Sequence, residues 1–364
     1  MSGVLVHEWI AQSGGSENVL EAMSTIYPDA DIVCLWNDST GRFDPQRLHE
    51  TWLARTPLRQ SKAAALPLMP PTWRRLRTEE HEWALISSHL FAHHAYSAQP
   101  EVERFVYVHT PARYIWSPEL DARGAGLPVR AASASFKRID RRRAREGACF
   151  AANSAFVRGR IRAAWGIDAR VIHPPVEVEA IQERDWPSEL DEADRATLDA
   201  LPDSFVLGAS RFIPYKRLDL VIRTGEVANM PVVLAGKGPE HARLRQAASA
   251  ASVDVRFVLA PSDALLRALY SRASLFVFPA IEDFGIMPVE AMAAGTPVLA
   301  QRVGGAAESV LPGISGALTA FESDADIARA LSDALAVERS TVRAHALRFS
   351  RSRFDGEIRE WVGR

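Results

Sequence analysis

The segment between Glu282 and Glu290 holds two carboxylates on either side of a glycine, Gly285. It follows the apolar run 275–278, which predicts a buried strand, and it leads into 289–294, which predicts a helix. The first turn of a helix has free backbone N–H groups at the positive end of the helix dipole, so a turn of this kind binds anions. Gly285 lets a ligand come close to the backbone.

The residue types in this segment favour a ligand that carries both phosphate and hydroxyl groups. A carboxylate accepts hydrogen bonds from hydroxyls but repels phosphate. We therefore expect Glu282 and Glu290 to meet hydroxyls and the backbone amides to meet a diphosphate, with Pro288 at the first helical position. Taken singly, Glu290 is also explained as a complement to the helix N-terminus and Glu282 as a solvated loop residue. The nine-residue segment as a whole favours function.

A cationic group follows the strand-like run 205–208. Arg211 offers a fork of donors that matches two phosphate oxygens, and Lys216 offers a point charge. Hydrogen bonds to charged partners are each worth about 1.5–3 kcal/mol, so the pair can neutralise a diphosphate. The alternative is a surface loop, which is what we expect of Arg217. Lysine is scarce in this chain, and this scarcity favours a function for Lys216. Of the 43 basic residues only four are lysines, namely Lys62, Lys137, Lys216 and Lys237.

Two further candidates follow strand-like runs in the first half of the chain. His109 ends the run 105–109, and Gly14 and Gly15 follow the run 3–7. A histidine at the end of a strand is about as often structural as functional, and two glycines by themselves indicate a turn.

Metal binding is not expected. His89, His93 and His94 lack a cysteine or carboxylate at ligand spacing, so we interpret them as exposed helix residues. The D-x-D patterns at 29–31 and 324–326 are interpreted as helix-capping residues.

The elements that must carry these residues are short apolar runs that alternate with amphipathic stretches of helical length. This alternation is typical of parallel sheets flanked by helices, so we predict the α/β class with two domains. A polar, proline-rich stretch at 174–203 separates them. We predict a first domain at 1–180 with a returning helix at about 346–364, and a second domain at 181–345. The predicted strands are 3–7, 32–36, 84–87, 105–109, 149–152 and 170–173, then 205–208, 232–235, 255–258, 275–278 and 298–300.

Composition excludes several classes of protein. A net charge of -2 argues against a general nucleic-acid binder, and two cysteines cannot form a disulfide framework. The first ten residues do not form a signal peptide, and no apolar run approaches the ~20 residues of a membrane span, so we expect a cytoplasmic protein. The basic segment 136–145 is interpreted as a solvated helix face. The alternative is peripheral contact with anionic lipid at the inner face of the plasma membrane.

These motifs together resemble the E-x7-E and R…K signatures of the family-4 retaining glycosyltransferases, which adopt the GT-B fold. Similarity extends along most of the chain. It covers Gly14-Gly15-Ser16-Glu17, the stretch 107–114, Ala152-Asn-Ser-Ala-Phe, Ala235-Gly-Lys-Gly-Pro and Gly304-Gly.

The resemblance implies two facing Rossmann-like domains with a nucleotide-sugar donor in the cleft, held mainly by the second domain. Arg211 and Lys216 would bind the diphosphate, and Glu290 would bind the ribose hydroxyls. Glu282 and the backbone of Phe284, Gly285 and Ile286 would hold the transferred sugar. His109 would lie near that sugar, and Gly14 and Gly15 would approach phosphates or acceptor. The nucleotide base would meet the stretch 257–259, which ends at Leu259, with Leu265 packing on it. No metal or other cofactor is implied.

The resemblance also implies a reaction, in which a hexosyl group is transferred to a hydroxyl with retention of configuration. The run 109–116 resembles mannosyltransferases of surface-polysaccharide biosynthesis, so GDP-mannose is the favoured donor and a UDP-sugar the second choice. The acceptor would be a saccharide or a lipid-linked molecule. Two rival functions remain: a nucleotide-sugar-binding protein without catalytic activity and a dinucleotide-dependent oxidoreductase. The oxidoreductase is disfavoured because no G-x-G-x-x-G follows 3–7 or 205–208.

Overall fold

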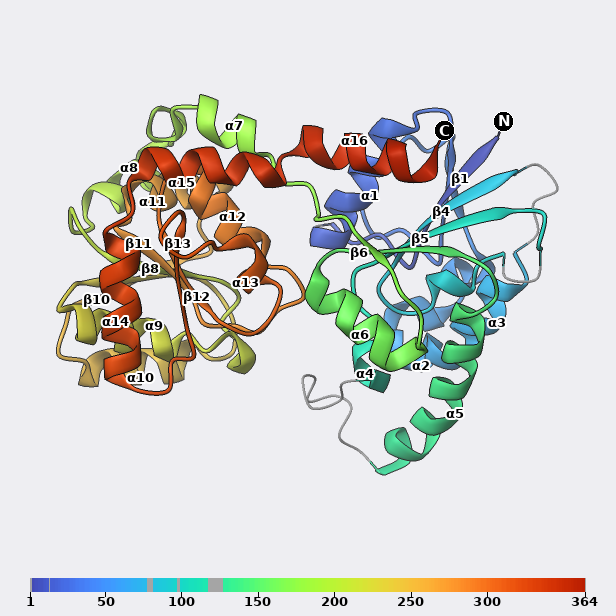
Figure 1. Ribbon diagram of the computed structural model, residues 1–364, viewed down its shortest axis with the longest axis horizontal. Helices are drawn as coiled ribbons and strands as arrows, with labels where there is room; N and C mark the ends of the chain where they lie inside the picture. The colour runs from blue at the N-terminus through green and yellow to red at the C-terminus, as the bar shows by residue number, and fades with distance from the viewer. Residues whose placement is uncertain (1, 13, 77–80, 97–98, 117–126, 364) are drawn as a thin grey trace. The chain divides into compact units, whose positions relative to one another are not determined.

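The computed structural model describes residues 2–12, 14–76, 81–96, 99–116 and 127–363. The chain divides into two compact units, each built on its own parallel sheet (Figure 1). The first comprises Met1–Pro175 together with Ser352–Arg364, and the second comprises Val176–Arg351. The sequence pattern predicts divisions at 180/181 and about 346, a few residues from these positions.

The first domain holds a parallel sheet in the order β3-β2-β1-β4-β5-β6-β7. Its core strands are apolar on both faces, as expected of a sheet covered by helices on each side. The short edge strand β3 has no apolar run and was not predicted. The strands are β1 Gly3–His7, β2 Asp31–Cys34, β3 Leu48–Glu50, β4 Trp83–Ser88, β5 Glu103–Val108, β6 Cys149–Ala152 and β7 Arg170–Val171.

Helices flank this sheet, and the last of them is the returning helix that the sequence predicts. Phe354, Ile358 and Val362 recur every four residues along α16 and pack with Leu5 and Leu85 in one buried cluster. In Figure 1, α16 lies next to α1. The helices are α1 Gly15–Ile26, α2 Lys62–Ala65, α3 Met69–Arg74, α4 Arg113–Trp116, α5 Leu127–Ala144, α6 Ala155–Trp165 and α16 Arg351–Val362, with 3-10 turns η1 Trp52–Arg55, η2 Pro57–Gln60, η3 Leu66–Leu68 and η4 Ala92–His94.

The second domain repeats the design with a parallel sheet in the order β10-β9-β8-β11-β12-β13. The edge strand β13 was not predicted. Its strands are β8 Val206–Ala209, β9 Val232–Gly236, β10 Val255–Leu259, β11 Leu275–Phe278, β12 Val298–Gln301 and β13 Gly316–Thr319. Its helices are α7 Val178–Glu183, α8 Glu192–Asp199, α9 Asp219–Ala228, α10 His241–Ala250, α11 Asp263–Arg272, α12 Ile286–Ala293, α13 Ala306–Ser309, α14 Asp324–Leu335 and α15 Arg339–Ala346, with 3-10 turns η7 Trp186–Glu189, η8 Pro214–Lys216 and η9 Leu347–Phe349.

Both sheets contain a point where the strand order reverses, between β1 and β4 in the first and between β8 and β11 in the second. Loops that leave neighbouring strands on the two sides of such a point diverge, and the crevice between them at the carboxyl edge is where open α/β sheets bind ligands. Gly14, His109, Arg211, Lys216 and Glu282 lie in segments that follow strands at these edges.

The expectation that His93 and His94 are exposed is wrong, because each is only 1% exposed. Their partner is Asp140, which stands far away in sequence on α5. Nε2 of His93 and of His94 lie 3.0 and 3.2 Å from Asp140 Oδ1. The indole N–H groups of Trp116 and Trp165 each donate to Oδ2 over 2.7 Å. This buried carboxylate therefore ties η4, α4, α5 and α6 together.

The D-x-D patterns are also not helix caps. Asp31 lies in β2, and its carboxylate is 3.1 Å from His81 Nε2. Ser323 is the N-cap of α14, since its hydroxyl accepts the amide of Asp326 over 3.1 Å. Asp324 and Asp326 occupy the first turn, where negative charge complements the helix dipole.

Among the helices that the structure describes, none combines the length and the apolar character needed to cross a membrane.

We expect the free energy of unfolding to fall as the pH is lowered from about 6.5 to about 4. Burial, with the neighbouring His93, lowers the pKa of His94 to about 4. In this window the unfolded chain binds a proton at His94 that the folded chain does not, so acid favours unfolding. Above the ordinary histidine pKa the stability is present in full. Urea unfolding at several pH values measures the slope.

His94→Gln should reduce this slope. His49→Gln is the matched control, because the side chain of His49 is 56% exposed. His7 and His109 also have lowered pKa values caused by burial, so part of the slope should remain. Equal slopes in the wild type and in His94→Gln would contradict the assignment.

Candidate functional site

The loop between β8 and α9 presents the two candidate cations differently. Lys216 ends the turn η8 and is only 7% exposed, and its ammonium group forms an ion pair with the Glu282 carboxylate. The rings of Tyr215 and Phe278 lie 5.2 and 5.7 Å from its Nζ. Arg211 is exposed, and its guanidinium takes no partner in the described parts of the chain. Lys216 is thus already fixed, and Arg211 is available to a ligand.

Two glycines, one at the end of β9 and one just after it, hold this loop in place. A Cβ at Gly236 would lie 1.9 Å from the carbonyl oxygen of Ser210, and one at Gly238 would lie 2.4 Å from that of Phe212. The amide of Phe212 donates to the carbonyl of Lys237 over 2.8 Å. The two loops are therefore packed backbone against backbone.

The turn after β11 begins its helix earlier than the sequence predicts. Gly285 is the N-cap with φ of 95°, a left-handed conformation that favours glycine, and α12 starts at Ile286 instead of 289. Pro288 is consequently the third helical residue and not the first. No described group accepts the amides of Gly285, Ile286 and Met287. Free amides at the start of a helix can bind an anion, and this is the role that the sequence predicts for this turn.

Glu290 lies on α12 and is held by two residues of α11. The guanidinium of Arg267 donates to its carboxylate over 2.7 Å, and the hydroxyl of Tyr270 lies 3.4 Å away. Burial opposes the charge of Arg267, but the Glu290 carboxylate raises the pKa of Arg267 above its ordinary value. Glu290 is therefore a fixed, partnered acceptor. Neither Arg267 nor Tyr270 was predicted from the sequence as a partner of Glu290, although they lie one helical turn apart on α11.

The residues predicted to meet a nucleotide base differ in accessibility. Leu259 ends β10 and is 53% exposed, whereas Leu265 is 2% exposed and lies in the core of the domain. Only Leu259 of this pair presents an apolar surface to a ligand.

The first domain gathers buried and partly buried polar side chains at the carboxyl edge of its sheet. His109 follows β5, and its Nε2 lies 2.8 Å from the hydroxyl of Ser87 at the end of β4. Burial holds the pKa of His109 well below its usual value. Glu8, missed by sequence reasoning, is fully buried, and its carboxylate accepts the amides of Leu90 and Ala92 over 2.8 Å each. Glu8 thereby fixes the chain after β4.

The two candidate glycines of this domain form the start of α1. Gly14 is the N-cap with extended backbone, and Gly15 is the first helical residue. A Cβ at Gly14 would lie 2.2 Å from the Glu17 carboxylate, which also accepts the amide of Ala11 over 3.2 Å. The glycine makes room for a buried carboxylate here.

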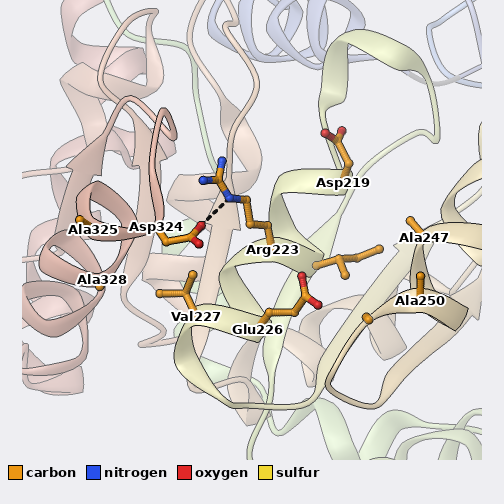
Figure 2. A pocket seen from close by; sticks show the side chains of 11 residues that line it. Asp219, Arg223, Glu226, Val227, Ala247, Ala250, Asp324, Ala325 and Ala328 are labelled. Atoms are coloured by element: carbon orange, nitrogen blue, oxygen red, sulfur yellow. Dashed lines mark hydrogen bonds and ion pairs between the residues drawn. The ribbon is translucent and has the colours of Figure 1, made fainter.

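Two surface hollows lie apart from the candidate residues. Figure 2 shows one of about 840 Å³, lined by α9, α10 and α14, where Arg223 and Asp324 pair over 2.7 Å. Its lining is mostly short apolar side chains and contains no predicted site residue. The other, of about 830 Å³, runs along α5. It is lined by Ala134, Lys137, Arg138, Arg141, Arg142, Arg145 and Glu146.

Part of the basic segment 136–145 also has a structural role. Arg141 and Arg145 donate to the carbonyls of Ala164 and Trp165, each over 2.8 Å. These carbonyls end α6, where cations complement the helix dipole. The segment is thus not simply a solvated face.

The second half of the chain is similar in sequence to known proteins. Residues 191–348 match the family model of Glycosyl transferases group 1, a range that contains all the candidate residues of the second domain. A D-inositol 3-phosphate glycosyltransferase of Streptomyces bingchenggensis is 34% identical over 179 residues, 44% of this chain and 38% of that protein. The Mycobacterium avium protein of the same name is 31% identical over 198 residues, 50% and 45% of the two chains. The aligned part spans less than half of these relatives.

Solved structures resemble the whole chain. Anabaena HepE, crystallised with UDP, has a TM-score of 0.71 at 19% identity and covers 99% of both chains. Sucrose-phosphate synthase from Thermosynechococcus elongatus has a TM-score of 0.71 at 16% identity and covers 100% of this chain and 98% of its own. At these identities the likeness shows the fold alone. It confirms the predicted GT-B class of two Rossmann-like parallel-sheet domains.

We expect Gly305→Ala to destabilise the turn that carries Glu282. A Cβ at Gly305 would lie 2.1 Å from the carbonyl oxygen of Asp283, and the Gly305 amide donates to the Glu282 carbonyl over 2.7 Å. Overpacking of this kind costs about 1–3 kcal/mol, which urea unfolding would measure.

Gly356→Ala is the control for this substitution, because a Cβ on that helical glycine meets nothing within 4 Å. It should be neutral or stabilising by up to about 1 kcal/mol. If Gly305→Ala and Gly356→Ala unfold at the same urea concentration, the close contact between Gly305 and the Asp283 carbonyl is refuted.

Proposed function

We propose that this chain is a glycosyltransferase that moves a hexosyl group from a nucleotide-diphosphate sugar to a hydroxyl acceptor. One observation carries the proposal. Lys216, Glu282 and the unpartnered amides of Gly285 and Ile286 come together at the carboxyl edge of the second sheet, next to the reversal of strand order. The family match over 191–348 and the glycosyltransferases among its relatives support it.

In this proposal, departure of the nucleoside diphosphate is the step that needs help. Negative charge grows on the leaving oxygen, and fixed cations and amides aimed at it stabilise the transition state. Arg211, Lys216 and the amides after β11 supply these groups without a metal ion. Lys216 has three N–H donors, so it can hold Glu282 and a phosphate oxygen at the same time.

The carboxylates take the hydroxyl groups of the donor in this scheme. Glu282, oriented by Lys216, accepts from the transferred sugar, and Glu290, oriented by Arg267, accepts from the ribose. Leu259 offers the base an apolar contact. The family resemblance implies that His109 lies near the transferred sugar. The family resemblance adds retention of configuration.

The donor we propose is a UDP-sugar, with GDP-mannose as the alternative. Sequence resemblance alone favours GDP-mannose, but HepE was crystallised with UDP and with UDP-glucose. The acceptor is a saccharide or a lipid-linked hydroxyl. In the second case the basic segment 136–145 is the surface that would meet anionic lipid.

A nucleotide panel tests the donor. Ligand at about 100 times its Kd adds about 2.7 kcal/mol to the free energy of unfolding. We expect UDP to raise the unfolding temperature more than GDP or ADP does. A larger shift with GDP would restore the GDP-mannose alternative, and no shift with any of them would refute nucleotide binding. Slow donor hydrolysis without acceptor separates an enzyme from a silent binding protein.

Lys216→Ala should lower kcat/KM for transfer at least ~10²-fold, because it removes a cation aimed at developing charge. Steady-state kinetics on the folded variant measure this. The matched control is Arg217→Ala, the adjacent exposed cation, whose partner is Asp219. Near-normal kinetics in Lys216→Ala, or an equal loss in both variants, would remove Lys216 from the mechanism.

A further inference from the structure

Three polar side chains form a line across the first sheet at its carboxyl edge. The register of β1 and β4 pairs His7 with Ser87, and that of β4 and β5 pairs Ser88 with Val108, which places His109 one residue further on. His7 Nδ1 lies 3.0 Å from Ser87 Oγ, which lies 2.8 Å from His109 Nε2. The serine hydroxyl thus connects two imidazole rings.

Among the described residues the Ser87 hydroxyl contacts only these two ring nitrogens, so its single proton must be donated to one of them. If both rings donated to the hydroxyl, that buried proton would be left without an acceptor, so two arrangements of neutral rings remain. In the first, His7 Nδ1–H donates to Ser87, and Ser87 donates to His109 Nε2. His109 then carries its proton on Nδ1. In the second, every donor and acceptor is reversed, and His109 Nδ1 is a bare acceptor.

The far nitrogen of His7 distinguishes these arrangements. His7 is 0% exposed, and its Nε2 has no hydrogen-bond partner among the described residues. The second arrangement would place a proton there and bury an unpaired N–H donor. The first leaves only a lone pair. Orphaned buried N–H groups are rarer and cost more than under-used acceptors, so the first arrangement is favoured.

The surroundings keep both rings neutral. The rings of His89 and Tyr107 lie 6.3 and 5.3 Å from that of His109, and burial with the charges of His89 and His7 holds the pKa of His109 well below normal. Burial and His89 lower the pKa of His7 to about 4, against the opposing effect of Glu8 and Glu17.

We propose that Ser87 and His7 are positioning residues that fix His109 with its proton on Nδ1. His109 then presents an N–H donor at the carboxyl edge of the first sheet, and its ligand there is an oxygen acceptor of the nucleotide sugar. The identity of that ligand rests on the proposed function. The tautomer itself does not.

Long-range ¹H–¹⁵N NMR of the full chain tests the tautomer without any activity. His109→Gln identifies the His109 signal among those of the ten histidines. We expect a protonated Nδ1 and a bare Nε2 in the wild type. Ser87→Ala should lose this pattern. Ser88→Ala should keep it, because the Ser88 hydroxyl contacts Glu8 and His93 instead. A protonated Nε2 in the wild type, or an unchanged pattern in Ser87→Ala, overturns the inference.

Kinetics with UDP-glucose and GDP-mannose test the positioning role. Loss of the hydrogen bond to His109 should lower kcat/KM about tenfold in Ser87→Ala and hardly at all in Ser88→Ala. At position 7, Asn keeps an N–H close to the place of Nδ1 and Leu does not. His7→Asn should therefore retain both tautomer and activity, and His7→Leu should lose both. If Ser87→Ala does not fold, the comparison of His7→Asn with His7→Leu still tests whether the hydrogen-bonded chain positions His109.

The two proposals can fail separately. If the NMR pattern is as expected but no sugar nucleotide is turned over, the glycosyltransferase proposal fails and the His109 tautomer stands. If Ser87→Ala changes the tautomer but leaves kcat/KM unchanged, the positioning role is overturned and the glycosyltransferase proposal stands.

Discussion

Backbone packed directly against backbone fixes the carboxyl edge of the second sheet. At Gly236 and Gly305 a Cβ would overlap carbonyl oxygens of the loops that follow β8 and β11. The loop after β8 carries Lys216 and the loop after β11 carries Glu282, so their ion pair forms between two supported backbones. A catalytic group contributes most when its position is set before the ligand arrives. These glycines hold the backbones of Lys216 and Glu282 in place before any ligand binds, which is the condition that the proposed function requires.

The first domain fixes its loops differently, with buried carboxylates surrounded by N–H donors. Glu8 accepts the amides of Leu90 and Ala92, and Asp140 is approached by two indoles and two imidazoles. A buried charge is tolerated only when it is well satisfied, and such a group then fixes one arrangement of the chain around it. The two domains thus share an architecture but not the interactions that hold their loops.

Much of the fold could be predicted from local patterns, and the exceptions have physical causes. Apolar runs identified the core strands, and four-residue periodicity identified α16. The edge strands β3 and β13 are short and carry few β-forming residues, so they gave little signal. In the site, motif positions marked Lys216 and Glu282, whose roles stay predictions. Contacts such as Asp140 with His94 join residues 46 positions apart, and no local pattern reveals them.

The returning helix makes the second domain an insertion within the first. Phe354, Ile358 and Val362 complete the cluster that contains Leu5, so this part of the first domain's core cannot form until α16 has left the ribosome. The segment Val176–Arg351, in contrast, is complete before α16 is synthesised. Domains generally fold from the N-terminus as they emerge. In this chain, all residues of the second domain have been synthesised while the first domain still lacks α16.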